Sequence, residues 1–307
     1  MNAVEARLTV VAGAYAGSLG EAARSTLTAG GKRVRPLLTL LCADRRAPIP
    51  GGVIHAAAAT ELLHMATLVH DDVLDRAELR RGRATVAHGF GVATAVSTGN
   101  YLLARAFAEL AQTGDGAAVA LLSRTAVGLS EGEVLQRNEA YDITLGSDAY
   151  RRRCERKTAD LFAAACRLGA LLSGLHHGDQ DALSAYGRSL GLAFQVFDDI
   201  LDLSGDEART GKRRGTDVRA GTVTLPLIFA LEAKPDLGPR LRAGGELDDA
   251  AVAAVIAGVR ASGAIDRARE AALGSIAEAR RVLATCSEGV ELDLLEQVAS
   301  SVVDRYA

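Results

Sequence analysis

Residues 60–75 read Thr-Glu-Leu-Leu-His-Met-Ala-Thr-Leu-Val-His-Asp-Asp-Val-Leu-Asp, an apolar stretch that ends in three closely spaced aspartates. At about 100° per residue, a helix places the polar side chains in one narrow arc and the apolar ones opposite. The polar arc holds Thr60, His64, Thr67, Asp71 and Asp75. A solvated face normally mixes Lys and Glu at i, i+4 spacing, and this arc does not. The pattern predicts a helix that carries Asp71, Asp72 and Asp75 into a cavity.

A second acidic motif, Asp198-Asp199-Ile200-Leu201-Asp202, repeats the arrangement. Helical spacing puts its aspartates on the same face as Gly191 and Gln195, with Phe197 and the other apolar residues elsewhere. Burying six carboxylates is prohibitive unless cations compensate them. The economical explanation is that two acidic helix faces share divalent metal ions, and such metals imply a polyanionic ligand.

Basic segments accompany both acidic motifs. Arg80-Arg81-Gly82-Arg83 follows the first motif, and residues 211–217 (Gly-Lys-Arg-Arg-Gly-Thr-Asp) follow the second. Gly30-Gly31-Lys32-Arg33-Val34-Arg35-Pro36 places further cations on a turn that opens a helix, where backbone N–H groups favour an anion. Lys157-Thr158 adds a lysine and a hydroxyl within a helix-forming stretch. Arginine and lysine beside metal-binding carboxylates indicate phosphate binding.

Composition favours an all-α protein. The chain has 307 residues with abundant Ala and Leu, six Pro and no Trp, and strand signatures are scarce. A formal net charge of −3 gives no reason to expect nucleic acid. The four cysteines form no Cys-x-x-Cys pair, which indicates small core residues of a reduced, cytoplasmic protein.

The organisation indicates one domain over residues 1–307. Helical periodicity begins near Val4, breaks at Ala29-Gly30-Gly31, resumes after Pro36 and continues without a linker. The longest irregular stretches, 76–91 and 204–223, each follow an acidic motif and are candidate lids. No signal peptide opens the chain, and charges or glycines interrupt the apolar runs before the ~20 residues of a bilayer span. We therefore expect a protein without a transmembrane segment.

These motifs, in this order, resemble the trans-isoprenyl diphosphate synthases of the polyprenyl synthetase family. The resemblance extends from residue 30 to Pro226 and includes Gly-Gly-Lys-Arg-x-Arg-Pro, the first acidic motif with Arg80-Arg81-Gly82, Glu131-Gly132-Glu133, Lys157-Thr158-Ala159, and Gly191-x-x-x-Gln195-x-x-Asp198-Asp199 with Gly211-Lys212. It implies a single-domain antiparallel helical bundle around a central cavity, the isoprenoid synthase fold, and a homodimer. The long-chain polyprenyl diphosphate synthases are the most similar group.

The resemblance also assigns roles. Isopentenyl diphosphate would bind without a metal to Lys32, Arg35, His64 and Arg81. Magnesium, about three ions with substrate bound, would bridge an allylic diphosphate to Asp71, Asp75 and Asp198, assisted by Asp72, Asp199 and Asp202. The same diphosphate would be clasped by Arg80, Lys157 and Lys212. Thr158 and Gln195 would face the developing cation. For His64, the alternative is a hydrogen-bonded core residue.

The chemistry of such a site needs no protein nucleophile. Breaking an allylic C–O bond creates a carbocation and a diphosphate, so cations must stabilise the leaving group while water is excluded. The double bond of isopentenyl diphosphate then attacks, and the departed diphosphate removes the final proton. Two departures from the family pattern stand out: Gly221-Thr222-Val223-Thr224 replaces Gly-Lys-x-Thr, and Gly99-Asn100-Tyr101 replaces Gly-Asp-Phe. The missing lysine predicts weaker allylic ground-state binding, not inactivity.

The resemblance also bears on product length: short-chain members of the family often place aromatic residues four or five positions before the first aspartate, about one 5.4 Å turn away, or insert two residues in the motif, and this chain does neither. Ala66 and Thr67 occupy that place, so no aromatic ring closes the path of a growing chain. We expect a long product of about six or more isoprene units, with geranylgeranyl or farnesyl diphosphate as the alternative. A class I terpene cyclase would not need a second diphosphate site and would be richer in aromatics. A noncatalytic partner subunit should have lost one acidic motif.

Overall fold

The computed structural model describes residues 1–205, 214–241 and 247–304, and these are helical apart from short connections and one small hairpin. Their contacts form two compact units, each described here by itself. The first comprises residues 1–126, 161–187 and 283–295, and the second comprises 127–160, 188–282 and 296–307. Helices α7 (Gly116–Asn138), α9 (Asp160–Leu172), α10 (His177–Ser204), α16 (Ala264–Leu283) and α17 (Leu292–Asp304) contribute residues to both.

The first unit begins with α1 (Asn2–Gly13), α2 (Ser18–Thr28), α3 (Val34–Leu41) and α4 (Gly51–Leu74). A hairpin of β1 (Leu79–Arg80) and β2 (Arg83–Ala84), then α5 (Val86–Phe90) and α6 (Val92–Ala111), follow it. The helical periodicity expected between Val4 and the glycine turn is divided between α1 and α2, and Gly17, with φ of 79°, is the N-cap of α2. The helix expected after Pro36 already begins at Val34 and includes the proline, because an N–H in the first helical turn has no acceptor within the helix and its loss costs nothing there.

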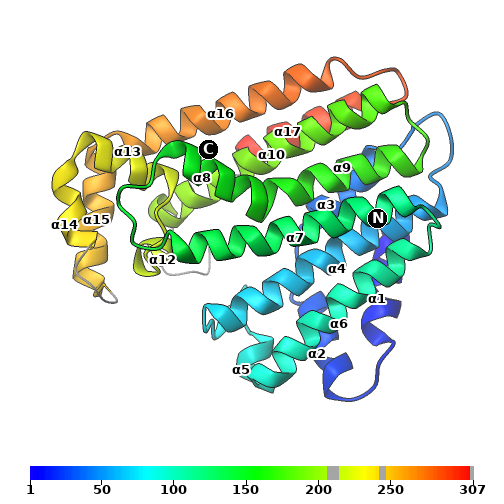
Figure 1. Cartoon of the computed structure of the whole chain (residues 1–307), viewed down its shortest axis with the longest axis horizontal. Coiled ribbons are helices and arrows are strands. Elements are labelled where there is room, and N and C mark those ends of the chain that lie inside the picture. Colours follow the sequence, from blue (N-terminus) through cyan, green and yellow to red (C-terminus); the bar gives the residue numbers. More distant parts are fainter. Residues whose placement is uncertain (206–213, 242–246, 305–307) are drawn as a thin grey trace. The chain divides into compact units, whose positions relative to one another are not determined.

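Helix α4 is the centre of the first unit and lies beside α6 (Figure 1). Many of its apolar residues are almost completely buried, among them Leu62, Met65 and Val69, whereas Leu74 at its end is exposed. Gly99 of α6 lets the two helices approach, because a Cβ there would lie 2.2 Å from His70 Nε2. By length and composition, α4 could cross a membrane, which corrects the expectation that no apolar run is long enough. However, 67% of its most apolar 18-residue segment is buried inside the protein, as in the core helix of a globular protein.

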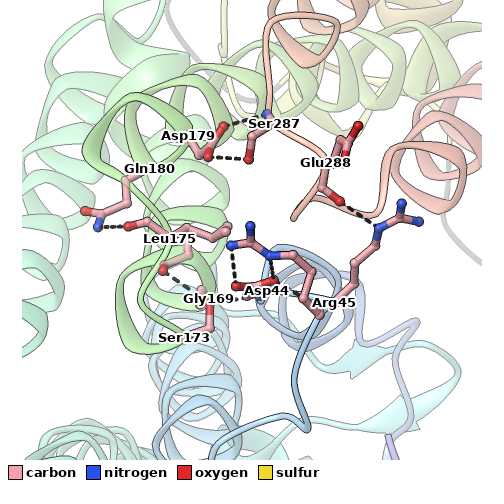
Figure 2. A network of polar contacts seen from close by, with 11 residues as sticks. Asp44, Arg45, Gly169, Ser173, Leu175, Asp179, Gln180, Ser287 and Glu288 are labelled. Carbon is pink, nitrogen blue, oxygen red and sulfur yellow. Dashed lines mark hydrogen bonds and ion pairs between the residues drawn. The ribbon is translucent and has the colours of Figure 1, made fainter.

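A polar network joins the later segments of the first unit to its early loops (Figure 2). Asp179 accepts hydrogen bonds from both the backbone N–H and the hydroxyl of Ser287, at 2.8 and 2.7 Å. The Ser173 hydroxyl accepts from the Asp44 N–H at 2.9 Å, and Arg45 donates to the Glu288 carbonyl at 2.9 Å. Segments 44–46, 173–179 and 287–288 are therefore held together by side-chain contacts, not by periodic helix packing.

The second unit contains α8 (Ser147–Cys154), the π-helical turn η1 (Glu155–Ala159), α12 (Thr216–Arg219), α13 (Leu225–Ala233), η2 (Pro235–Leu237), α14 (Gly238–Leu241) and α15 (Asp249–Ala261). Its buried Arg153 donates to the Val223 carbonyl at 2.6 Å and pairs with Glu139 at 2.9 Å. This holds residues 221–230 in the core, where all of them are buried. The two stretches predicted to be irregular contain the hairpin, α5 and α12. The single domain over 1–307 stays a prediction.

Candidate active site

The first acidic motif closes α4, and its three aspartates have different surroundings. Asp71 is half-buried, Asp72 is 5% exposed, and Asp75 is the exposed C-cap residue. Arg80 Nε donates to Asp72 Oδ1 at 2.8 Å, so the hairpin after α4 folds its first arginine back onto the helix. Because Asp72 binds Nε, the two Nη groups of Arg80 keep their donors for an anion.

The basic turn at residues 30–35 lies beside this motif in the same unit. Arg33 has φ of 50° and pairs with Glu61 at 2.7 Å and Glu5 at 2.9 Å, so its role is structural. Arg81 donates to the Gly30 carbonyl, which joins the arginine loop to the turn. Lys32 is exposed.

Arg35 and His64 lie in surroundings that carry an excess of positive charge. Arg35 stacks on the Phe162 ring at 4.7 Å, and its buried Nε has no hydrogen-bond partner among the described residues. Burial, with Arg81 adding to it, lowers the pKa of Arg35 to about 10. Burial and the neighbouring arginines, Arg35 and Arg81 foremost, hold the pKa of His64 well below its usual value. These groups together suit an incoming anion.

The second acidic motif lies on α10, and its middle aspartate is again buried and held. Asp199 is 3% exposed and accepts from the Tyr150 hydroxyl at 2.7 Å and from Gln195 Nε2 at 2.8 Å. Burial raises the pKa of Asp199 to about 7, although these two hydrogen bonds act to lower it. Asp198 is half-buried. Asp202 accepts the backbone N–H groups of residues 216 and 217 at 3.1 and 3.2 Å, and so caps α12.

Lys157 and Thr158 lie in the π-helical turn η1, a local widening that often marks functional sites. Lys157 pairs with Glu133 at 2.6 Å. Burial alone would raise the pKa of Glu133, but Lys157 holds it below its usual value. The Thr158 hydroxyl donates to Gln195 Oε1 at 2.7 Å. Gly132 lets α7 pack closely against this turn, because a Cβ at that position would lie 2.5 Å from the backbone nitrogen of Lys157.

One cavity of the second unit gathers the predicted residues Lys157, Thr158, Gln195 and Asp199. Thr222, which stands where the family often has lysine, also lines it and is 8% exposed. Other lining residues were not predicted from the sequence, among them Tyr150, which donates to Asp199, and Arg153. Tyr150 precedes Lys157 by seven residues, a two-turn helical spacing that could have indicated a shared face.

The predicted chain-length residues differ in burial. Ala66 is 2% exposed, whereas Thr67 is half-buried and donates to the His64 carbonyl at 2.8 Å. Lys212 lies outside the described residues.

The carboxylates fit magnesium that arrives with a phosphate ligand. Among the described side chains, no group of three His, Cys, Asp or Glu residues forms a ready metal cage. Mg²⁺ seldom uses such cages, because it retains waters and binds through one or two carboxylates plus substrate phosphates. Asp71 and Asp198 offer oxygen donors of that kind at partly exposed positions.

The comparisons with known proteins agree with this arrangement. The polyprenyl synthetase family model matches residues 17–257. The chain is 41% identical to heptaprenyl diphosphate synthase component 2 of Geobacillus stearothermophilus over 267 residues, which cover 87% of this chain and 83% of that protein. It is 39% identical to the nonaprenyl diphosphate synthase of Mycobacterium tuberculosis over 261 residues, covering 83% and 77%.

Solved structures extend the likeness to the fold. The crystal structure of heptaprenyl diphosphate synthase from Staphylococcus aureus superposes with a TM-score of 0.95 at 30% identity, covering 99% of this chain and 96% of that one. A decaprenyl diphosphate synthase from Rhodobacter capsulatus gives 0.92 at 35% identity, covering 100% and 96%. The predicted all-α isoprenoid synthase fold is therefore confirmed. The chain belongs to the polyprenyl synthetase family.

Proposed function

We propose that this protein is a trans-prenyltransferase that condenses an allylic diphosphate with isopentenyl diphosphate. The observation that carries the proposal is the shared construction of the two acidic motifs. In each, the middle carboxylate is buried and held by side-chain donors, Arg80 for Asp72 and Tyr150 with Gln195 for Asp199. A helix end held in this way can present its outer carboxylates in a fixed geometry.

Isopentenyl diphosphate is assigned to the basic groups of the first unit, Lys32, Arg35, His64 and Arg81. The buried Nε of Arg35 supports this, because it lacks an acceptor among the described residues, which is costly, and an anion would satisfy it. The lowered pKa of His64 supports it too, because an arriving diphosphate would relieve the positive surroundings of the ring.

The allylic diphosphate is assigned to the acidic motifs. Asp71, Asp75 and Asp198 would hold magnesium, about three ions with substrate bound, with Asp72, Asp199 and Asp202 as supporting carboxylates. Bound magnesium would neutralise the charge of the departing diphosphate. Arg80, Lys157 and Lys212 would clasp the same leaving group, while the Thr158 and Gln195 oxygens lie toward the allylic carbon. The protein's contribution is thus positioning and electrostatic stabilisation.

A long polyprenyl product fits this chain best. The hepta-, nona- and decaprenyl synthases among its relatives support it, as does the absence of a ring at Ala66 and Thr67. A geranylgeranyl product is the second candidate, because the geranylgeranyl diphosphate synthase of Methanosarcina mazei is 35% identical over 294 residues. We propose a cytoplasmic homodimer; the name "component 2" of one relative makes a two-component complex the competing assembly.

Removal of one outer carboxylate tests the proposal. Asp198→Ala should lower turnover by about 10³-fold or more, because it deletes a magnesium ligand where the leaving-group charge develops. Asp181→Ala is the matched control, since that α10 side chain is 67% exposed and pairs with Arg167 at the surface. Near-normal activity of a folded Asp198→Ala protein at saturating magnesium would refute the metal assignment.

A further inference from the structure

The cavity of the second unit contains a continuous chain of hydrogen bonds whose direction is fixed. It runs from the Thr158 hydroxyl to Gln195 Oε1 at 2.7 Å, and from Gln195 Nε2 to Asp199 Oδ1 at 2.8 Å. The Tyr150 hydroxyl donates to the other oxygen, Asp199 Oδ2, at 2.7 Å. Thr158, Asp199 and Tyr150 are 7, 3 and 3% exposed, so water competes little with these contacts.

The carboxylate decides the direction of every bond in the chain. The Gln195 Nε2 group can only donate and lies 2.8 Å from Asp199 Oδ1, so the carboxylate oxygen is the acceptor and holds the NH₂ group of Gln195 toward itself. Gln195 Oε1 then faces Thr158, and the single hydroxyl proton of Thr158 is committed to that oxygen. What Thr158 offers to the cavity is therefore oxygen lone pairs and no proton.

We infer that Asp199 and Tyr150 are positioning residues that set the polarity of Thr158 and Gln195, so that these present negative dipole ends to a developing allylic cation. Donors aimed at the cavity would stabilise an anion, whereas fixed acceptors stabilise positive charge. The inference rests on the proposed prenyl transfer and deepens it, because it gives the supporting carboxylate Asp199 a role through Gln195 and Thr158 rather than as a direct ligand of a metal.

Local packing supports Tyr150 in this role. The Arg153 guanidinium lies 5.4 Å from the centre of the Tyr150 ring and is itself held by Glu139 and the Val223 carbonyl. The tyrosine is thus locked by neighbours that do not belong to the hydrogen-bond chain. Both oxygens of Asp199 accept from protein donors, one each, which fixes the orientation of the carboxylate toward Tyr150 and Gln195.

The sharpest test reverses the direction of these hydrogen bonds with one substitution and restores it with a second. Asp199→Asn has the same shape but can donate to Gln195 Oε1, which lets the amide invert and donate to Thr158. The Thr158 proton then points into the cavity, and kcat should fall about 10- to 100-fold. Adding Gln195→Glu supplies an acceptor for both the amide at position 199 and the Thr158 hydroxyl, which restores the original direction with unchanged net charge. The double variant should regain at least half of the lost kcat on a logarithmic scale.

Metal binding gives a readout apart from turnover. Mn²⁺ binding in the presence of inorganic diphosphate, followed by electron paramagnetic resonance, should change less than about threefold in Asp199→Asn, whereas Asp198→Asn should weaken it at least about tenfold. Tyr150→Phe leaves the direction intact and should lower kcat less than Asp199→Asn does, with the KM values of both substrates unchanged. Circular dichroism of each variant verifies folding.

The outcomes separate the two hypotheses. An inactive wild-type protein, tested with both substrates and magnesium, would reject the proposed function. With an active wild type, a roughly tenfold loss of Mn²⁺ affinity in Asp199→Asn would show a metal ligand and overturn the polarity role. A double variant no faster than the single one would overturn it as well. Recovery of kcat with normal Mn²⁺ binding would support it.

Discussion

Gly132→Ala should damage the site through backbone contact alone. Gly132 lies in the interior of α7. A methyl group added there would lie 2.5 Å from the backbone nitrogen of Lys157 and 2.8 Å from its Cα. Backbone atoms of the π-helical turn cannot rotate away as a flexible side chain can, so the turn itself must shift. That shift moves Lys157 and Thr158 together.

A glycine one turn earlier on α7 supplies the reference for the magnitude. At Gly128 a methyl group would meet only side-chain atoms, the nearest being Asp160 Oδ2 at 3.3 Å. Both substitutions gain the higher helix propensity of alanine, about 0.5–1 kcal/mol. Overpacking against an unyielding neighbour costs about 1–3 kcal/mol. Since the propensity gain cancels between the variants, their free energies of unfolding should differ by about 1–3 kcal/mol, with Gly132→Ala the less stable.

Urea denaturation gives the difference in stability, and steady-state kinetics gives the functional effect. We expect Gly132→Ala to lower kcat about 10- to 100-fold, because a displacement of about 1 Å at catalytic groups has effects of that size. Gly128→Ala should remain within about threefold of wild type. Equal stability and equal kcat for the two variants would refute the idea that contact with α7 fixes the position of the π-helical turn.

Three further predictions concern the first unit. Asp72→Asn removes the charged acceptor of Arg80, so the KM for the allylic substrate should rise about tenfold. The KM for isopentenyl diphosphate should not change. Steady-state kinetics with each substrate varied would contradict this if both KM values rose equally. Because the folded pKa of His64 lies below its unfolded value, wild type should lose stability as the pH falls below about 6.5, by up to about 1.4 kcal/mol per pH unit. His64→Gln should remove that loss in urea denaturation between about pH 7.5 and 5.5, and identical pH slopes would disprove it. Thr67→Phe should shorten products to about 15–20 carbons. Ala66→Phe should do the same and, because Ala66 is only 2% exposed, should also cost about 1–3 kcal/mol of stability. An unchanged length distribution in chromatography of the dephosphorylated products would contradict the prediction for both variants.

The helical fold and its acidic motifs were predictable because they depend on local periodicity. The apolar stripe of residues 60–75 does form a helix, and its last turn does carry the aspartates. Contacts between distant residues were less accessible. The bond from Tyr150 to Asp199 spans 49 residues, and that from Arg153 to the Val223 carbonyl spans 70. No repeating pattern links such pairs, so the side chains that hold the site appear only in the folded chain.

The π-helical turn and the structural role of Arg33 could not be predicted from the sequence either. The segment 155–159 has ordinary helix-forming residues, and its π-helical turn lies against Gly132 of another helix, a contact that the sequence does not indicate. Among the cations of the basic turn, residue type alone could not separate Arg33, committed to Glu61 and Glu5, from its neighbours. Arg33 is bound by two carboxylates, whereas among the described residues Arg80 is bound by one, through Nε, and only the folded structure shows this difference.

Prenyl transfer itself is tested most directly with the purified protein, labelled isopentenyl diphosphate, farnesyl diphosphate and magnesium, followed by separation of the dephosphorylated products by chain length. We predict magnesium-dependent incorporation into chains of about six or more isoprene units, abolished by Asp198→Ala and retained by Asp181→Ala. No incorporation by the wild-type protein, with farnesyl diphosphate or with a shorter allylic primer, would contradict the proposal that this chain is a prenyltransferase.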